Sequence, residues 1–485
     1  MQAHKSNPFT WQTWLRISAG LRDPAWLKKV GWWALFIAFI LRACWALMVP
    51  VIPVSDSNAY DIFAQNIAAG FGYGWNPGEL TAFWAVGTAA FYAMIFSVFG
   101  HTYVPIVIIN IIVGLGTIAL AMSLAQRWFG PVTSILTGWI LALWPLMIQF
   151  TTILASEMLF NFCVLVAFWV STLPGWKWLP RAFATGIALA AASYIRPVAL
   201  LLAPLAFLQE ALIQRRVVRA VAACTVSSMV MIALILPWSM RNLHVFDRFV
   251  LVSTNAGSNL WMGNNPKTTG GYMPLPKTNI VNEVDRDRYF SQKAWEYIRQ
   301  EPLTFVVRTL KKAVLVHDRE SIGIAWNEKG LKQNFGNGML MTLKIITNCY
   351  WWLILACAGS GLYLFIRNRR TWLEALTFPP LTAWAYYATV HSVIVAGDRY
   401  HIPSDPFIAM FAAYAISIVV RKLQASVDGE YHRWHNSGGR KTHQVNDTTA
   451  FSKDLEYWWQ RIERGVYSTH YSRTRQLFLS SEIHT

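Results

Sequence analysis

The chain has 485 residues, of which 54% are hydrophobic and 25 are Trp, and its formal net charge is +17. Apolar runs of about 20 residues recur along it, which is long enough to cross a bilayer core and excludes an ordinary soluble protein. Much of the positive charge lies in short loops beside these runs and in the tail. The positive-inside rule and anionic lipids explain that placement, so we expect membrane lipids, not nucleic acid, as partners.

The Lys and Arg residues in the connections predict the topology. Residues 1–30 are basic, so the N-terminus is predicted to be cytoplasmic and the first crossing to be 31–50. The next stretch, 51–104, contains no Lys or Arg and is predicted to be an outer loop. The apolar run 82–100 within it is short and interrupted by Gly. The later basic loops all fall on the cytoplasmic side only if this run does not cross the membrane. We therefore predict that it lies along the outer membrane surface as an interfacial helix.

Further crossings are predicted in chain order, which gives about ten in all. They are 105–125, 131–150, 157–173, 182–195, 198–213, 217–237, 339–366, 373–395 and 403–420. The two segments that flank Arg196-Pro197 are short, so we expect them to meet below the outer surface as a dipped hairpin. Arg196 would then be held at membrane depth.

The predicted fold is an all-α polytopic membrane protein. The polar stretch 238–338, with its Gly, Asn and Pro clusters, is predicted to be an extracytoplasmic loop region of mixed structure, and 421–485 a basic cytoplasmic tail. Between them lie the C-terminal crossings, 339–420, and before them a transmembrane module, 31–237. Both termini are therefore expected in the cytoplasm. The five cysteines show no CxxC spacing and indicate neither a disulfide framework nor a zinc site.

Three acidic residues are predicted to lie on the outer face. Asp56 follows the first crossing by six residues, Glu79 begins the interfacial helix and Glu157 begins a crossing. Each could simply favour a helix N-terminus. A carboxylate beside hydrocarbon is costly and tends to be functional, however, so Asp56 is a candidate general base. A divalent cation would need two or more such groups together with waters.

Three arginines, Arg196, Arg241 and Arg399, lie at or near predicted outer ends of crossings. They could pair with the same carboxylates, or they could converge on a phosphate, whose oxygens match a guanidinium bidentately. The Gly- and Asn-rich stretch 253–274 holds Asn264 and Asn265 near Trp261 and Tyr272, a composition that suits turns and also a sugar. The predicted sugar- and acceptor-binding set comprises Tyr60, Asn264, Asn265, Tyr400 and His401.

Six segments carry a resemblance to a known family. They are SDSNAYDIFAQNIAAGFGYG, FWAVGTAAFYAMIFSVFG, ASEMLF, YIRPVALLLAP, the stretch from LPWSMRN to NNPKTTGGY, and DRYHIPSDPFIAM. Over about residues 30–420 the chain resembles the membrane glycosyltransferases of the GT-C superfamily, in the group of protein O-mannosyltransferases and bacterial lipid A aminoarabinose transferases. The segment LTAFWAVGT stands where that group has a proline-rich helix start.

The resemblance implies a sugar donor on polyprenyl phosphate and a lipid, glycan or protein acceptor. It places the base on Asp56, a donor-phosphate contact on Arg196 and a metal on Glu79 and Glu157. The expected reaction is an inverting displacement at the extracytoplasmic face of the cell inner membrane, catalysed by a hexosyl- or pentosyltransferase. The alternatives are a non-enzymatic flippase or channel for lipids or polysaccharides, and a polymerase or ligase with a pyrophosphate-linked donor. Fingerprints of P-loop, zinc-protease, serine-esterase and Rossmann proteins are absent from the sequence.

Overall fold

The computed structural model describes residue 20, residues 23–369 and residues 371–436. Residues Met1–Gln424 form one compact unit and Ala425–Thr485 a second. The predicted tail, 421–485, lies outside the described residues from residue 437 onward, and most of the predicted N-terminal segment, 1–30, does so too. The account below therefore concerns the first unit.

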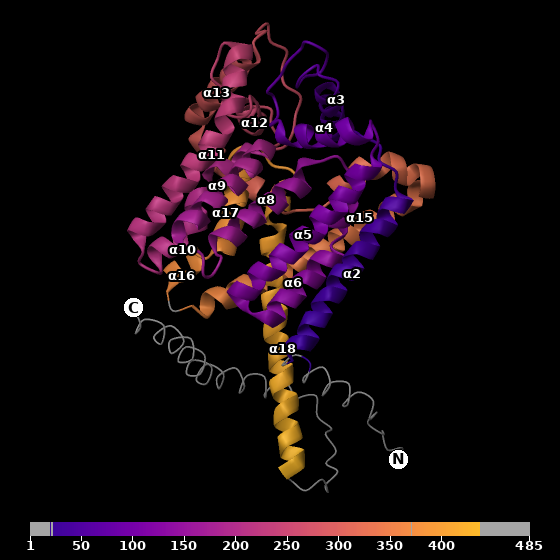
Figure 1. Ribbon diagram of the computed structural model, residues 1–485, viewed down its shortest axis with the longest axis vertical. Helices are drawn as coiled ribbons and strands as arrows, with labels where there is room; N and C mark the ends of the chain where they lie inside the picture. The colour runs from indigo at the N-terminus through magenta and orange to yellow at the C-terminus, as the bar shows by residue number, and fades with distance from the viewer. Residues whose placement is uncertain (1–19, 21–22, 370, 437–485) are drawn as a thin grey trace. The chain divides into compact units, whose positions relative to one another are not determined.

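The described chain is built from α-helices and short 3-10 helices (Figure 1). In chain order the helices are α2 (Pro24–Met48), α3 (Asp56–Ala68), α4 (Gly87–Phe99), α5 (Val104–Phe129), α6 (Pro131–Leu143), α7 (Pro145–Gln149), η1 (Phe150–Thr152), α8 (Ser156–Ser171), α9 (Trp178–Ile195), η2 (Pro197–Leu201), α10 (Leu202–Leu212), α11 (Val217–Phe246), α12 (Ala256–Gly263), α13 (Glu283–Gln300), α14 (Pro302–Leu315), α15 (Ile322–Arg367), α16 (Trp372–Leu376), α17 (Pro379–Val393), η3 (Ile402–Ser404) and α18 (Asp405–Asn436). Across the described ranges no strand forms, and the one isolated bridge joins Gly74 to Leu80.

Five helical segments are long and apolar enough to cross a membrane: Pro24–Met48, Val104–Phe129, Val217–Phe246, Ile322–Arg367 and Ile402–Ala425. A sixth forms if α6 and the segment Pro145–Thr152, bent by 54°, count as one span. The other predicted crossings coincide with the shorter helices α8, α9, α10 and α17. These findings confirm an all-α polytopic membrane protein, and about ten crossings remains a prediction.

Helix starts and breaks follow from local sequence. Proline occupies the first turn of α5, α6, α14 and α17, where its missing N–H group costs nothing. Pro145 separates α6 from α7, and Pro197 separates α9 from η2. The break before Pro197 leaves Arg196 as the C-terminal cap of α9, in extended conformation, as the predicted hairpin at this position requires.

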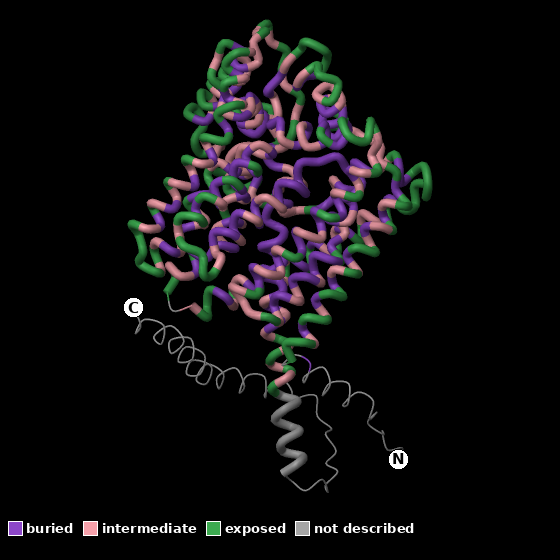
Figure 2. The backbone as a smooth tube through the Cα atoms, viewed as in Figure 1, coloured by how far each residue is buried: buried purple, intermediate pink, exposed green. Residues whose placement is uncertain are grey.

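Buried residues concentrate along the middle of the bundle, and exposed residues lie on its outward faces (Figure 2). Helix α18, drawn in yellow in Figure 1, passes through the bundle as far as Gln424. In its most apolar window 56% of the residues are buried, compared with 28–39% in the other four segments. The start of α18 is therefore held by neighbours on all sides, which makes it a rigid support for the loop that precedes it.

Two short helices cover one end of α5 and α9. Helices α3 and α4 pack on each other through a cluster that includes Phe63, Tyr92 and Phe96. In Figure 1 α4 runs at a steep angle to α2 and α5. With 13 residues α4 is too short to cross a bilayer, as predicted for 82–100. The predicted loop region 238–338 is also largely helical, because it contains α12, α13 and α14.

Candidate active site

Asp56 is the first residue of α3 and forms an ion pair with Arg399, which lies 343 residues further along the chain. The Arg399 Nη1 atom donates to Asp56 Oδ2 at 2.6 Å, and the two side chains keep 20% and 22% of their surface exposed. The N-cap residue, Ser55, has a φ of 52°, and its side chain makes no capping hydrogen bond. The Asp56 carboxylate is thus turned toward a partner across the fold and remains reachable by a substrate.

A cavity of about 1000 Å³ opens beside this ion pair. Its wall includes Asp56, Arg399, Tyr400, Trp326, Arg319 and Tyr272. The guanidinium of Arg399 lies 5.1 Å from the ring centroid of Trp326, which holds the arginine by a cation–π contact as well as by the ion pair. The cavity therefore offers a carboxylate, guanidinium groups and aromatic faces within one volume large enough for a sugar phosphate.

Arg196 lies in a second ion pair. It contacts Glu157, which is 1% exposed, and its Nε donates to Ser156 Oγ at 2.8 Å. Tyr60, on α3, senses the charges of both pairs. Burial, followed by the charges of Asp56 and Glu157 and opposed by Arg196, raises the pKa of Tyr60 to about 12. Of the three predicted phosphate-binding arginines, Arg399 lines the cavity beside Asp56, and Arg196 is not among the lining residues.

Arg241 supports the loop before α4. Its Nη1 donates to the carbonyl of Thr81 at 2.9 Å and to Asn242 Oδ1 at 3.0 Å, and its guanidinium lies over the ring of Trp238 at 4.6 Å. Glu79 lies two residues before Thr81 and accepts a hydrogen bond from Asn76 at 2.6 Å. Neither Arg241 nor Glu79 belongs to the wall of the cavity beside Asp56.

The two predicted sugar-binding asparagines are engaged by the fold. The Asn264 amide donates to the carbonyls of Leu260 and Val393, each at 2.9 Å, and its Oδ1 accepts from Lys312 Nζ at 3.1 Å. Asn265 donates to Trp261 O at 2.8 Å and accepts from the backbone N–H of Lys267. Both residues are buried. Their amides stabilise the turn after α12, so both side chains are already engaged within the fold.

His401 is buried and directly follows Tyr400, a residue of the cavity wall. Its Nδ1 lies 2.8 Å from Asp405 Oδ1, and its Nε2 lies 4.0 Å from Glu320 Oε1. These three residues are the one group of three or more potential metal ligands in the part of the chain that the structure describes, and it includes neither Glu79 nor Glu157. A set of residues that could hold a metal therefore exists, at a different place from the predicted pair.

Several residues of the cavity wall were not predicted as site residues. Trp326, Asp318, Arg319 and Asp398 all lie there. Asp398 accepts hydrogen bonds from the Ser321 N–H at 3.1 Å and from Ser321 Oγ at 2.5 Å, which fastens the loop of Arg399 to the start of α15. The available signal was the charged run HDRES at residues 317–321, which directly precedes α15.

Comparison with known proteins gives structural matches only. No family model matches the chain, and no curated protein matches its sequence. The fold is similar to the archaeal oligosaccharyltransferase AglB from Archaeoglobus fulgidus, solved with an inhibitory peptide and a dolichol-phosphate. That match has a TM-score of 0.52 and 14% identity, and it covers 89% of this chain and 54% of the archaeal one.

Two further solved structures match. One is the same oligosaccharyltransferase tethered to an acceptor peptide with an NVT sequon, at a TM-score of 0.51, 14% identity and coverage of 90% and 54%. The other is ArnT from Cupriavidus metallidurans bound to undecaprenyl phosphate, at a TM-score of 0.48, 14% identity and coverage of 81% and 60%. The chain spans about half the length of the archaeal proteins. The likeness to the archaeal enzyme concerns the fold: this chain shares the fold of that oligosaccharyltransferase, in line with the architecture expected from the sequence.

Proposed function

We propose that the protein is a membrane glycosyltransferase that moves a sugar from a polyprenyl-phosphate donor to an acceptor hydroxyl. The observation that carries the proposal is the ion pair of Asp56 with Arg399 in the wall of a cavity of about 1000 Å³. A base and a phosphate-binding cation are the two groups that such a transfer needs. The fold supports the choice of donor, because the archaeal oligosaccharyltransferase of the same fold was solved with a dolichol-phosphate.

In the proposed mechanism Asp56 accepts the proton of the acceptor hydroxyl while that oxygen attacks the anomeric carbon. The bond from the anomeric carbon to the phosphate oxygen breaks, and the polyprenyl phosphate leaves with the bonding electrons. Arg399 stabilises the negative charge on that leaving phosphate. Because the same guanidinium holds Asp56, an incoming phosphate competes with the carboxylate for it, which frees Asp56 to act as base when the donor is bound.

Arg196 has a supporting role in this proposal. Its guanidinium is already engaged by Glu157 and Ser156, so it has less capacity for a phosphate than Arg399 has. Both ion pairs act electrostatically on Tyr60 of α3. We infer that the ion pair of Arg196 with Glu157 stabilises the packing of α3, and that Arg399 provides the donor-phosphate contact. The reaction would take place on the extracytoplasmic side, where the sequence places the loop 51–104.

The decisive experiment compares Asp56→Asn with the unmodified protein, purified in detergent and incubated with defined polyprenyl-phosphate sugars and a panel of acceptors. Removal of a general base typically costs about 10²–10⁴ in rate, so turnover should fall by that factor while donor binding persists. The matched control is Asp247→Asn: Asp247 is 99% exposed and has a φ of 53°, a conformation that asparagine tolerates. Turnover of the Asp56 variant within about threefold of the control would reject the role of Asp56 as base.

A further inference from the structure

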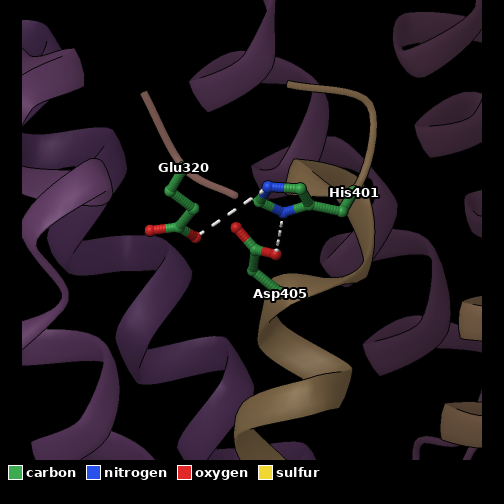
Figure 3. Close-up of side chains that lie close together, drawn as sticks. All are labelled: Glu320, His401 and Asp405. Atoms are coloured by element: carbon green, nitrogen blue, oxygen red, sulfur yellow. Dashed lines mark hydrogen bonds and ion pairs between the residues drawn. The ribbon is translucent and has the colours of Figure 1, made fainter. Parts of the chain in front are cut away.

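The side chains of Glu320, His401 and Asp405 meet in the interior, between the segment before α15 and the start of α18 (Figure 3). All three residues are 0% exposed. One ligand atom from each lies within 4.8 Å of the other two. They come from two parts of the chain that are far apart in sequence, and the proposed transfer reaction uses none of them.

The hydrogen bonds of this cluster leave two buried atoms without a partner. His401 Nδ1 lies 2.8 Å from Asp405 Oδ1, which makes the ring donate an N–H to a carboxylate. Its Nε2 then carries a lone pair, and that lone pair faces Glu320 Oε1 at 4.0 Å, too far for a hydrogen bond. Within the described residues, neither His401 Nε2 nor Asp405 Oδ2 has a hydrogen-bond partner.

The charges of the cluster are likewise uncompensated. Glu320 accepts from Trp144 Nε1 at 3.0 and 3.2 Å, and this indole is a neutral donor. No Lys or Arg in the described ranges forms an ion pair with Glu320 or with Asp405. Two buried carboxylates without a cation are costly, because charge is poorly solvated in a low-dielectric interior.

One divalent ion would bind the two unpartnered atoms and would also neutralise the buried negative charge. An imidazole nitrogen with carboxylate oxygens is a donor set of Zn²⁺ and its neighbours among the transition metals. A metal-bound histidine almost always donates its other N–H to a carboxylate or carbonyl. Here Asp405 Oδ1 accepts that N–H, which leaves Asp405 Oδ2 and His401 Nε2 as the atoms that would bind the ion. Ligand atoms around such an ion lie about 3.3 Å apart, so the side chains would close by up to about 1.5 Å.

We propose that Glu320, His401 and Asp405 form a binding site for one divalent transition-metal ion of the Zn²⁺ class, which joins the segment before α15 to the start of α18. Arg399 lies two residues before His401 in the chain. Asp398 accepts a hydrogen bond from the N–H of Ser321, the residue that follows Glu320. The ion would therefore position the loop that carries Arg399 without contacting the substrate.

The test is the metal content of the purified full-length protein. The protein is stripped with a chelator, titrated with Zn²⁺ alone and analysed by elemental mass spectrometry after desalting, and thermal unfolding is followed in parallel. We expect about one Zn²⁺ per chain and a higher unfolding temperature with Zn²⁺ than without. Glu320→Gln and His401→Asn should each weaken binding at least about tenfold. The controls Glu328→Gln and His101→Asn alter an exposed carboxylate and a half-exposed imidazole outside the cluster and should retain the ion.

Three results would overturn the proposal. They are unmodified protein that neither retains Zn²⁺ nor unfolds at a higher temperature with it, equal retention in both cluster variants, and loss of the ion in the control variants. If His401→Asn does not fold, the nearly isosteric Glu320→Gln decides. None of these readouts requires the transferase reaction, so they remain valid if that proposal fails.

Discussion

At the scale of single residues, the structure assigns different tasks to charges that look alike in the sequence. Arg42 lies within the first crossing and is 1% exposed, and its guanidinium donates to the carbonyls of Ala38, Leu141 and Ala142. It is a structural partner of the backbone, as expected for a cation inside a span. Arg399 differs because its partner, Asp56, is an accessible carboxylate in a cavity wall.

This difference yields a prediction for Arg399. Arg399→Lys keeps the charge and loses the planar fork that binds phosphate oxygens bidentately, so we expect the KM for the lipid-phosphate donor to rise about tenfold. Arg399→Ala should raise it further and also lower kcat, since the leaving phosphate loses its counter-charge. Initial rates over a range of donor concentrations separate the two effects. Arg288→Lys, on the 57% exposed Arg288 of α13, is the matched control, and an unchanged KM in Arg399→Ala would contradict the assignment.

At the scale of elements, backbone contacts decide how closely the helices approach. Gly361 of α15 packs against α18 so closely that a Cβ atom there would lie 1.9 Å from the carbonyl oxygen of Phe411. Gly359, on the exposed face of the same helix, would carry a methyl group with no heavy atom within 4 Å of it. Two neighbouring glycines of one helix thus have opposite constraints.

The pair Gly361→Ala and Gly359→Ala tests this contact. We expect Gly361→Ala to destabilise the protein by about 1–3 kcal/mol, because the helices must separate to admit the methyl group. Gly359→Ala should be neutral or stabilising by up to about 1 kcal/mol, since alanine has the higher helix propensity. Thermal unfolding of both variants in the same detergent gives the comparison. Equal unfolding temperatures for the two variants would show that α15 and α18 do not approach this closely.

At the scale of the whole molecule, the candidate site is assembled from parts of the chain that are far apart in sequence. Glu283 of α13 accepts from the N–H of Ala82 at 2.6 Å and from the hydroxyls of Thr81 and Thr254, which ties the first predicted outer loop to the long one. Lys312 of α14 donates to Val393 O at 2.8 Å and so holds the loop that leads to Arg399. These hydrogen bonds help to bring Asp56 and Arg399 into the wall of the same cavity.

The predicted orientation of the chain can be tested by labelling. In a variant whose five native cysteines are replaced by alanine, Val281→Cys should react with a membrane-impermeant maleimide in intact cells, because Val281 is 94% exposed in the predicted extracytoplasmic region. Trp176→Cys, at a position that is 50% exposed in a predicted cytoplasmic loop, should react only after the membrane is permeabilised. The reverse pattern would place the cavity on the cytoplasmic side and would remove the argument for a lipid-linked donor.

The sequence alone was sufficient for the helical membrane architecture, the short helix within 82–100 and the break at Arg196-Pro197. These features depend on runs of apolar residues and on proline, and both act on neighbouring residues through hydrophobic burial and backbone geometry. Asp56 and Arg399 were also named from the sequence as candidates, because a carboxylate beside hydrocarbon tends to be functional and a guanidinium can bind a phosphate.

Only the tertiary structure decided which charges meet. Asp56 pairs with Arg399 and Arg196 with Glu157, Asn264 and Asn265 bond to backbone groups, and His401 lies between Glu320 and Asp405. Pairings over tens to hundreds of positions depend on how helices pack and where loops are fastened, and local patterns carry no information about either. The sequence determines the chemical groups that each residue offers. Which of these groups come together in space follows from the packing free energy of the whole bundle.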